Sequence, residues 1–86
     1  MKKLEKSLKA VANQRRLSIL KLLKENKEQS VSVIAFKIKL SIRSTSKHLA
    51  ILFGADILDR EQRNFQTFYR LLQNQEPSVK YIISIL

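Results

Sequence analysis

Residues 34–52 read IAFKIKLSIRSTSKHLAIL, and this stretch decides how the chain folds. It predicts a short helix, a tight turn at Leu40–Ser41 and a second helix from Ile42 to about Phe53. Apolar side chains gather on one side of the second helix, and basic and hydroxyl side chains gather on the other. This is the layout of a helix-turn-helix, which places its second helix in the major groove of DNA.

Two helices are predicted before this motif, over Lys2–Ala12 and Gln14–Lys24, because apolar residues recur there at helical spacing. Asn13 separates the two helices and is a suitable N-cap for the second. Ser32 is the predicted N-cap of the first helix of the motif, which makes the helix-turn-helix span about residues 32–53. Ser30–Val31 is long enough only for a fragment of strand.

After the motif, Gly54 is suited to end the helix, and the apolar period then changes from helical to alternating. Ile57–Gln62 and Phe65–Leu71 are predicted to form a hairpin over about residues 57–71. Its turn is expected at Arg63-Asn64, because Asn tolerates the left-handed conformation. Pro77 can then open a last helix in its first turn.

Composition limits the function classes that are open to this chain. Its 86 residues form one predicted domain, residues 1–86, and the absence of Cys excludes disulfides and thiolate metal sites. The sequence contains no run of about 18 apolar residues and no apolar signal core near its start. We therefore expect a cytoplasmic protein that makes no membrane contact.

The net charge of +10 is unevenly distributed along the chain. Residues 1–53 hold 13 Lys+Arg against 3 Asp+Glu, whereas residues 54–86 hold 4 against 4. The excess therefore lies in the part that contains the helix-turn-helix, where Lys and Arg could neutralise phosphates. A solvated basic surface, or one that binds an anionic membrane, would have the same composition.

Three helices, a basic helix-turn-helix, a hairpin and a final helix together resemble the ArsR/SmtB family of small dimeric bacterial repressors. Leu8–Leu23, LKAVANQRRLSILKLL, is similar to that family's opening pattern, and Ser44–Leu52, STSKHLAIL, is similar to its recognition helix. The resemblance covers about residues 8–71. It implies a winged helix-turn-helix of order α-α-α-α-β-β-α, which is mainly α-helical with a small β-hairpin as its wing.

The chain departs from the metal-sensing members of that family. They carry a Cys-Val-Cys sequence at the start of the third helix, where this chain has Ser30-Val31-Ser32. Hydroxyl groups do not replace thiolates as ligands for soft or borderline metals, so we expect no metal and no cofactor. Lys39 stands in the turn where the family commonly has Gly.

The candidate DNA-binding residues are the exposed polar residues of the helix-turn-helix and the hairpin turn. Arg43 and Lys47 are one helical turn apart, and Arg can bond a guanine edge through two hydrogen bonds. The other candidates are Ser44 and Ser46 on the same helix, Ser41 (more simply its cap), Lys37 and Lys39 before it, and Arg60, Arg63 and Asn64 near the hairpin turn. For each, an ordinary solvated surface is the alternative.

Three further residues have specific expectations. His48 is the only His, and we expect it to hydrogen-bond a neighbouring helix or turn rather than to bind a metal. Arg16 lies near a helix N-terminus, where it could approach a phosphate or form an internal ion pair. Ile42 is expected to pack on the core, with contact to a thymine methyl group as the alternative.

Apolar stripes occur at both ends of the chain. The resemblance implies that the helices at about residues 2–12 and 77–86 pair across a two-fold axis, which makes the chain a homodimer. The predicted interface residues are Leu4, Leu8, Val11, Val79, Ile82, Ile83 and Leu86. Packing of the two ends within one chain is the alternative.

The sequence thus predicts a homodimeric regulator that binds double-stranded DNA, reads a pseudo-palindromic operator through residues 42–53 and most simply acts as a repressor. It contains no nucleophile with a matching base and no phosphate loop, so an enzyme is not expected. The alternatives are a non-specific architectural nucleic-acid-binding protein and a winged helix that serves only as a protein-interaction module.

Overall fold

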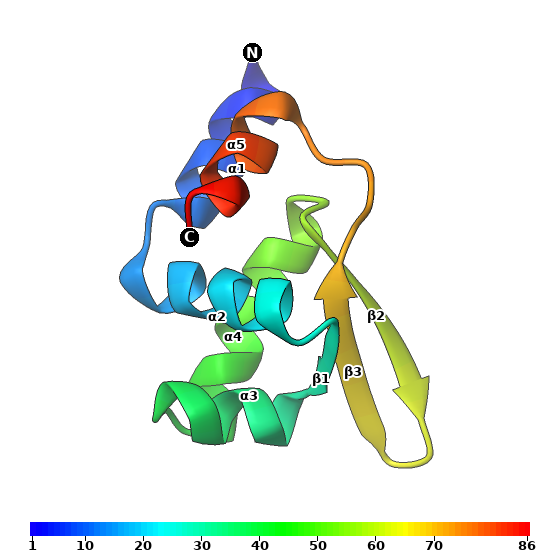
Figure 1. The fold of residues 1–86 in the computed structure, drawn as a ribbon. Helices are drawn as coiled ribbons and strands as arrows, with labels where there is room; N and C mark the ends of the chain where they lie inside the picture. Colours follow the sequence, from blue (N-terminus) through cyan, green and yellow to red (C-terminus); the bar gives the residue numbers. More distant parts are fainter.

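The computed structural model describes residues 1–86 as five helices and a small antiparallel sheet (Figure 1). The helices are α1 (Lys2–Val11), α2 (Gln14–Glu25), α3 (Val31–Ile38), α4 (Ile42–Gly54) and α5 (Pro77–Ser84). The strands are β1 (Glu28–Ser30), β2 (Leu58–Arg63) and β3 (Gln66–Leu71). The predicted winged helix-turn-helix is therefore confirmed, with one additional short strand, β1.

Helix α2 lies at the centre of the molecule. In Figure 1, α1 and α5 lie side by side at one end of the molecule, and α3 and the start of α4 lie at its other end. The sheet runs alongside the helices. Ile19, Leu20 and Leu23 of α2 are buried in a core that also includes Leu49 and Leu52 of α4. The broad apolar face that the sequence gives α2 therefore contacts helices on two sides, as a central helix requires.

The first helix of the motif starts earlier than predicted. Ser30, not Ser32, is the N-cap: its Oγ accepts a hydrogen bond from the backbone N–H of Val33 at 3.3 Å. Ser30 is also the last residue of β1, where pairing with β3 holds it in the extended conformation that an N-cap needs. The prediction for Ser32 was wrong because it ignored this pairing.

The turn of the helix-turn-helix and the start of α4 lie where the sequence predicts them. Lys39 has a left-handed backbone, with φ of 60°, at the position where a glycine would be unstrained. Ser41 then caps α4, as predicted, by accepting a hydrogen bond from the N–H of Ser44 at 3.0 Å. Two side-chain caps, those of Ser30 and Ser41, thus set where α3 and α4 begin.

The end of α4 differs from the prediction. Gly54 is the last helical residue and not a left-handed cap, and the positive φ falls at Asp56, at 59°. A Cβ added to Gly54 would meet no atom within 4 Å, so neither backbone conformation nor space requires glycine there.

The sheet has the order β1-β3-β2, with both pairings antiparallel. The hairpin is confirmed, but Arg63 pairs with Gln66, so its two-residue turn is Asn64-Phe65, one residue later than predicted. Asn64 has φ of 56°, which is the left-handed conformation expected of it. In Figure 1, this turn lies at the same end of the molecule as α3.

The final helix is anchored at its first turn. The Glu76 carboxylate accepts hydrogen bonds from the N–H groups of Ser78 and Val79, and Pro77 occupies the first helical position as predicted. No helix of the protein has the length and apolar character that a membrane crossing would need.

Candidate nucleic-acid interface

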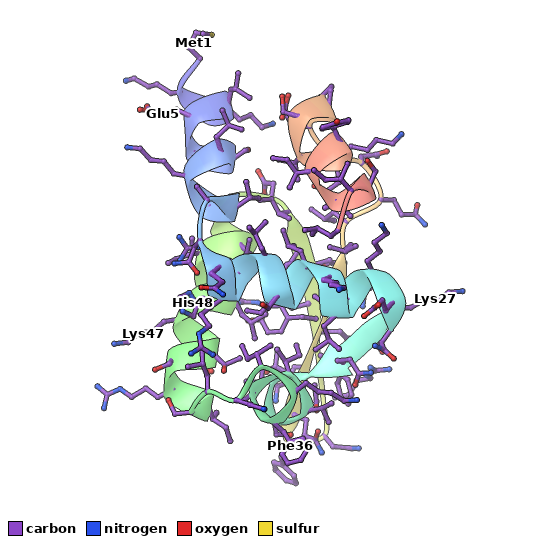
Figure 2. All side chains as sticks on the ribbon, turned by 60° about the vertical axis from the view of Figure 1, so that its left-hand side comes forward. Met1, Glu5, Lys27, Phe36, Lys47 and His48 are labelled. Atoms are coloured by element: carbon purple, nitrogen blue, oxygen red, sulfur yellow. The ribbon has the colours of Figure 1, made fainter.

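The outer face of α4 presents the predicted recognition residues to solvent. Thr45, Leu49 and Leu52 turn inward and are fully buried. Four residues of α4 were predicted to contact DNA, and all four are exposed: Arg43, Ser44, Ser46 and Lys47. Figure 2 shows Lys47 extending away from the protein. The structure therefore brings these four residues together on one free helical face.

Other cations surround this face. Lys37 and Lys39 are exposed at the end of α3, and with Lys21 they line a shallow hollow between α2 and α3. Arg15 donates a hydrogen bond from Nη1 to the carbonyl of Ile38 at 2.8 Å, which joins the start of α2 to the end of α3. Neither α3 nor α4 contains an acidic residue, and the one carboxylate that lines this hollow is that of Glu25 at the end of α2.

Large apolar side chains are also exposed at this end, which the sequence analysis did not anticipate. Ile42 is 58% exposed, so the expectation that it packs on the core was wrong. It is the first residue of α4, and the buried part of the helix begins only at Thr45. Phe36 on α3 is 83% exposed and projects from the bottom of the molecule in Figure 2.

His48 has the structural role that was expected of it. Its Nδ1 lies 3.1 Å from Nη1 of Arg16, where α2 meets α4 (Figure 2). Partial burial, together with the positive charges of Arg16 and Arg15, lowers the pKa of His48 below its usual 6.5. The imidazole is therefore neutral at pH 7 and accepts a hydrogen bond from Arg16.

Arg16 makes no ion pair. Besides bonding His48, it donates from Nε to the carbonyl of Ala10 at 2.5 Å and from Nη2 to that of Lys9 at 3.4 Å. One guanidinium thus joins the end of α1, the start of α2 and the middle of α4. The sequence identified Arg16 as a candidate but not these partners, because two of them are backbone carbonyls.

The wing holds its arginines by internal contacts. Arg60 was predicted near the turn, but it lies within β2 opposite Tyr69, with its guanidinium 3.9 Å from the centre of the Phe53 ring. Arg63 is closer to the turn and stacks on Phe68 at 4.0 Å. Both stacks are cation–π contacts. Only Asn64 of the three predicted wing residues occupies the turn itself.

Acidic side chains neutralise part of this wing. Glu28 of β1 forms ion pairs with Arg63 and, at 3.1 Å, with Arg70, and Arg70 also pairs with Asp59 at 2.8 Å and Glu61 at 3.5 Å. The hydrogen bond from Arg63 lowers the pKa of Glu28. Glu28 was not predicted to belong to this cluster, because only the β1–β3 pairing brings it close to the hairpin.

The apolar residues of α1 and of the C-terminal segment from α5 onward form two sets, one buried inside the protomer and one nearer its surface. Val11 and Val79 are 4% and 0% exposed within the single chain, so the prediction that they form a subunit interface was wrong. They instead pack in the protomer's own core, where α1 meets α5.

The outer set leaves an apolar surface on α1 and α5. Leu8 is 41% exposed, while Leu4, Ile82, Ile83 and Leu86 are partly buried. Tyr81 and Ile85 were not predicted as interface residues, although they are 67% and 64% exposed. They lie one helical turn apart on the side of this segment that faces away from Val79, outside the predicted apolar stripe.

The structure contains no group of three His, Cys, Asp or Glu side chains placed to hold a metal ion. A hollow of about 620 Å³ lies between the end of α2 and the strands and is lined by Lys24, Lys27, Asp59 and Arg70 among others. Arg70 and Asp59 bond each other there, so neither offers a free charge to a ligand.

Comparisons with known proteins agree with this geometry. The sequence profile of the bacterial regulatory protein, arsR family, matches residues 13–60, which include the whole helix-turn-helix. The transcriptional activator HlyU of Vibrio cholerae is 40% identical over 79 residues, which cover 92% of this chain and 69% of HlyU. The structure of HlyU superposes with a TM-score of 0.82 at 34% identity over 98% of this chain and 87% of the HlyU chain.

Two other solved structures are similar over nearly the whole chain. One is a homodimeric winged helix-turn-helix DNA-binding domain from Mycobacterium bovis, with a TM-score of 0.83 and 25% identity over 98% of this chain and 74% of that one. The other is the transcriptional repressor PagR of Bacillus anthracis, with a TM-score of 0.79 and 27% identity over 98% of this chain and 92% of PagR.

Proposed function

This chain belongs to the ArsR family of bacterial regulatory proteins, and we propose that it is a homodimeric transcriptional regulator that binds a specific DNA sequence through α4. The observation that carries this proposal is the free outer face of α4. Arg43 and Lys47 are exposed on a helix whose opposite side is fully buried. A rigidly held helix with donors on its outer face suits the major groove.

The surroundings of α4 support binding to a polyanion. Lys37 and Lys39 lie on the same side of the protein as the start of α4, and α3 and α4 contain no carboxylate. These cations would contact or attract phosphates on either side of the groove. Ser41 is used as a helix cap and contributes at most its second lone pair. We assign no phosphate contact to Arg60, because its guanidinium is stacked on Phe53.

A two-fold dimer would be formed by the outer apolar residues of α1 and α5. Leu8, Tyr81 and Ile85 are all exposed, and they belong to two neighbouring segments, since α1 contacts α5. The homodimeric relative from Mycobacterium bovis supports this assembly. Such a dimer would place two copies of α4 in successive major grooves about 34 Å apart, on an inverted repeat.

Whether the protein represses or activates transcription is a prediction. Repression is the simplest outcome of binding at a promoter, and PagR is a repressor, whereas HlyU is an activator. Either activity would be exerted in the cytoplasm by occupation of DNA and would require no catalytic step.

The test is selection of bound sequences from a randomised duplex library at near-physiological salt. The parent would be compared with a variant that carries Arg43→Ala and Lys47→Ala. Its control would carry Lys2→Ala and Lys3→Ala, which remove the same charge from the start of α1, at the opposite end of the molecule (Figure 1). We expect an enriched inverted repeat for the parent and the control, and none for the recognition-face variant.

The alternatives give different results. Salt-sensitive binding without an enriched sequence would indicate an architectural nucleic-acid-binding protein. Absence of binding to any duplex at moderate salt would indicate a protein-interaction module. Equal enrichment by all three proteins would show that α4 is not the recognition element.

A further inference from the structure

Ile42 occupies the first position of α4, and the protein leaves most of its side chain uncovered. It is 58% exposed, although the inner face of the same helix is completely buried from Thr45 onward. Burial of such a side chain against another molecule would stabilise the complex, because the hydrophobic effect favours its removal from water. Its position at the start of α4 and the charges around it indicate which molecule could cover it.

The charges around Ile42 indicate a polyanion. Arg43 is adjacent, Lys39 lies three residues before it in the turn, and Lys47 follows on the outer face. A second basic copy of this surface would be repelled, and no carboxylate on α3 or α4 would bind a cationic partner. These charges exclude a second copy of this surface and a cationic protein as the covering molecule, and among polyanions DNA is the one that the proposed function supplies.

The chemistry of the DNA groove limits what Ile42 can contact. The first residues of a recognition helix lie against base edges, and an isoleucine can neither donate nor accept a hydrogen bond. The one apolar group that base pairs display in the major groove is the C5-methyl group of thymine. Building on the proposed function, we propose that Ile42 determines specificity by packing against a thymine methyl group in each half-site.

The position of Arg43 adds a second constraint. Arg43 follows Ile42 directly, and the two side chains diverge by about 100° around α4 at the same end of the helix. Both therefore face the same half-site. With Arg43 bonded to a guanine, each half-site contains a guanine as well as the thymine.

The experiment uses the inverted repeat that the library selection gives, with each thymine in turn replaced by deoxyuridine. Uracil keeps every hydrogen-bonding group of thymine and lacks only the methyl group, so the change isolates the apolar contact. For the parent, we expect one position per half-site at which the change weakens binding about fourfold, as expected for one buried carbon group. The other positions should show little change.

Variants of this residue assign the effect to Ile42. In Ile42→Ala, binding to the thymine duplex should fall to the level of the uracil duplex, and the methyl dependence should disappear. Ile42→Val should retain part of it. The matched control is Ile51→Ala on the same helix, about 14 Å further along, where the isoleucine is 45% exposed. That variant should keep the full methyl dependence.

The outcomes separate this inference from the proposed function. Specific binding without any methyl-dependent position would overturn the role of Ile42 and leave the regulator assignment standing. A methyl dependence that persists in Ile42→Ala would assign the contact to another residue. If the parent binds no duplex, both proposals fail.

Discussion

The Arg16 Nη1 atom, on α2, lies 3.1 Å from Nδ1 of His48, on α4. Because a guanidinium can only donate, His48 accepts this bond at Nδ1, and its proton is on Nε2. Arg16 also bonds the carbonyls of Lys9 and Ala10 at the end of α1. Through Arg16, α4 is thus joined to α1, one of the two helices that carry the terminal apolar surface.

The partial burial of His48, together with the positive charges of Arg16 and Arg15, gives stability a pH dependence. In the folded protein the pKa of His48 lies below 6.5, so as the pH falls the unfolded chain binds a proton at His48 before the folded protein does. The free energy of unfolding therefore falls as the pH drops from about 6.5 toward the lower pKa of the folded protein. In His48→Asn, which keeps an acceptor near Nδ1 but does not titrate, the fall from pH 7.5 to 5.5 should be smaller. Urea denaturation of both proteins at the two pH values measures the difference, and equal falls would show that His48 is not the titrating group.

Arg43 should read a base and not merely supply charge. Arg43→Lys keeps the charge but loses the two parallel hydrogen bonds that guanine accepts, so it should cost about 1–3 kcal/mol on the selected duplex. Binding to an unrelated duplex should change little. Titrations against both duplexes give this ratio, and equal losses on both would make Arg43 a phosphate contact.

The exposed residue Ile85 offers the sharpest test of the dimer. Ile82 and Ile83 also pack against the protomer core, so a charge at either position would damage folding as well as association. Ile85→Asp should leave the helical content unchanged and weaken association by at least about a hundredfold, because it buries an unpaired carboxylate at the interface.

Light scattering over a range of protein concentrations measures this association. Phe36→Asp is the matched control, since Phe36 is an exposed apolar residue at the opposite end of the molecule (Figure 2). A persistent dimer mass for Ile85→Asp would locate the interface elsewhere.

The wing arginine Arg63 should contribute little to DNA binding while Glu28 holds it. We expect Arg63→Ala to change affinity by less than about threefold at physiological salt, because the lost charge was already paired. Glu28→Gln should release Arg63 and steepen the salt dependence of binding by up to about one unit. In that background, Arg63→Ala should cost more affinity than in the parent, and equal costs would mean that the ion pair does not restrain the wing.

The left-handed backbone at Lys39 should lower stability. Side chains with a Cβ cost about 1–2 kcal/mol in this conformation, whereas glycine does not. Lys39→Gly should therefore be about 1 kcal/mol more stable than Lys39→Ala, although both lose the same charge. Thermal unfolding measures this difference, and DNA binding by the two variants should fall equally if Lys39 contacts a phosphate.

The elements that the sequence predicted well depend on neighbours in the chain. The caps at Asn13 and Ser41 and the helix start at Pro77 are local features, because the bonding partners lie within three residues. The same holds for the left-handed Asn64 in the hairpin turn. Such features can be predicted before any tertiary contact is known.

The errors share a different physical cause. A helical projection gives the angle of Ile42 around α4 but not its position along the axis, and Ile42 lies beyond the end of the core. The choice of Ser30 over Ser32 depends on pairing between β1 and β3, which are 38 residues apart at Ser30–Phe68. Likewise, the stacking of Arg60 on Phe53 and the pairing of Glu28 with Arg63 exist only once the sheet has formed.

The order of the sheet has a consequence for aggregation. Both outer strands, β1 and β2, leave one edge of backbone N–H and C=O groups unpaired, and such edges can recruit strands from other molecules. Here β1 is only three residues long, and β2 carries Asp59, Arg60 and Glu61 in succession. A short edge and an edge of mixed charge both oppose edge-to-edge pairing with strands of other molecules. The sheet can therefore expose both of its outer strands to solvent without offering a long apolar edge on which a fibre could start.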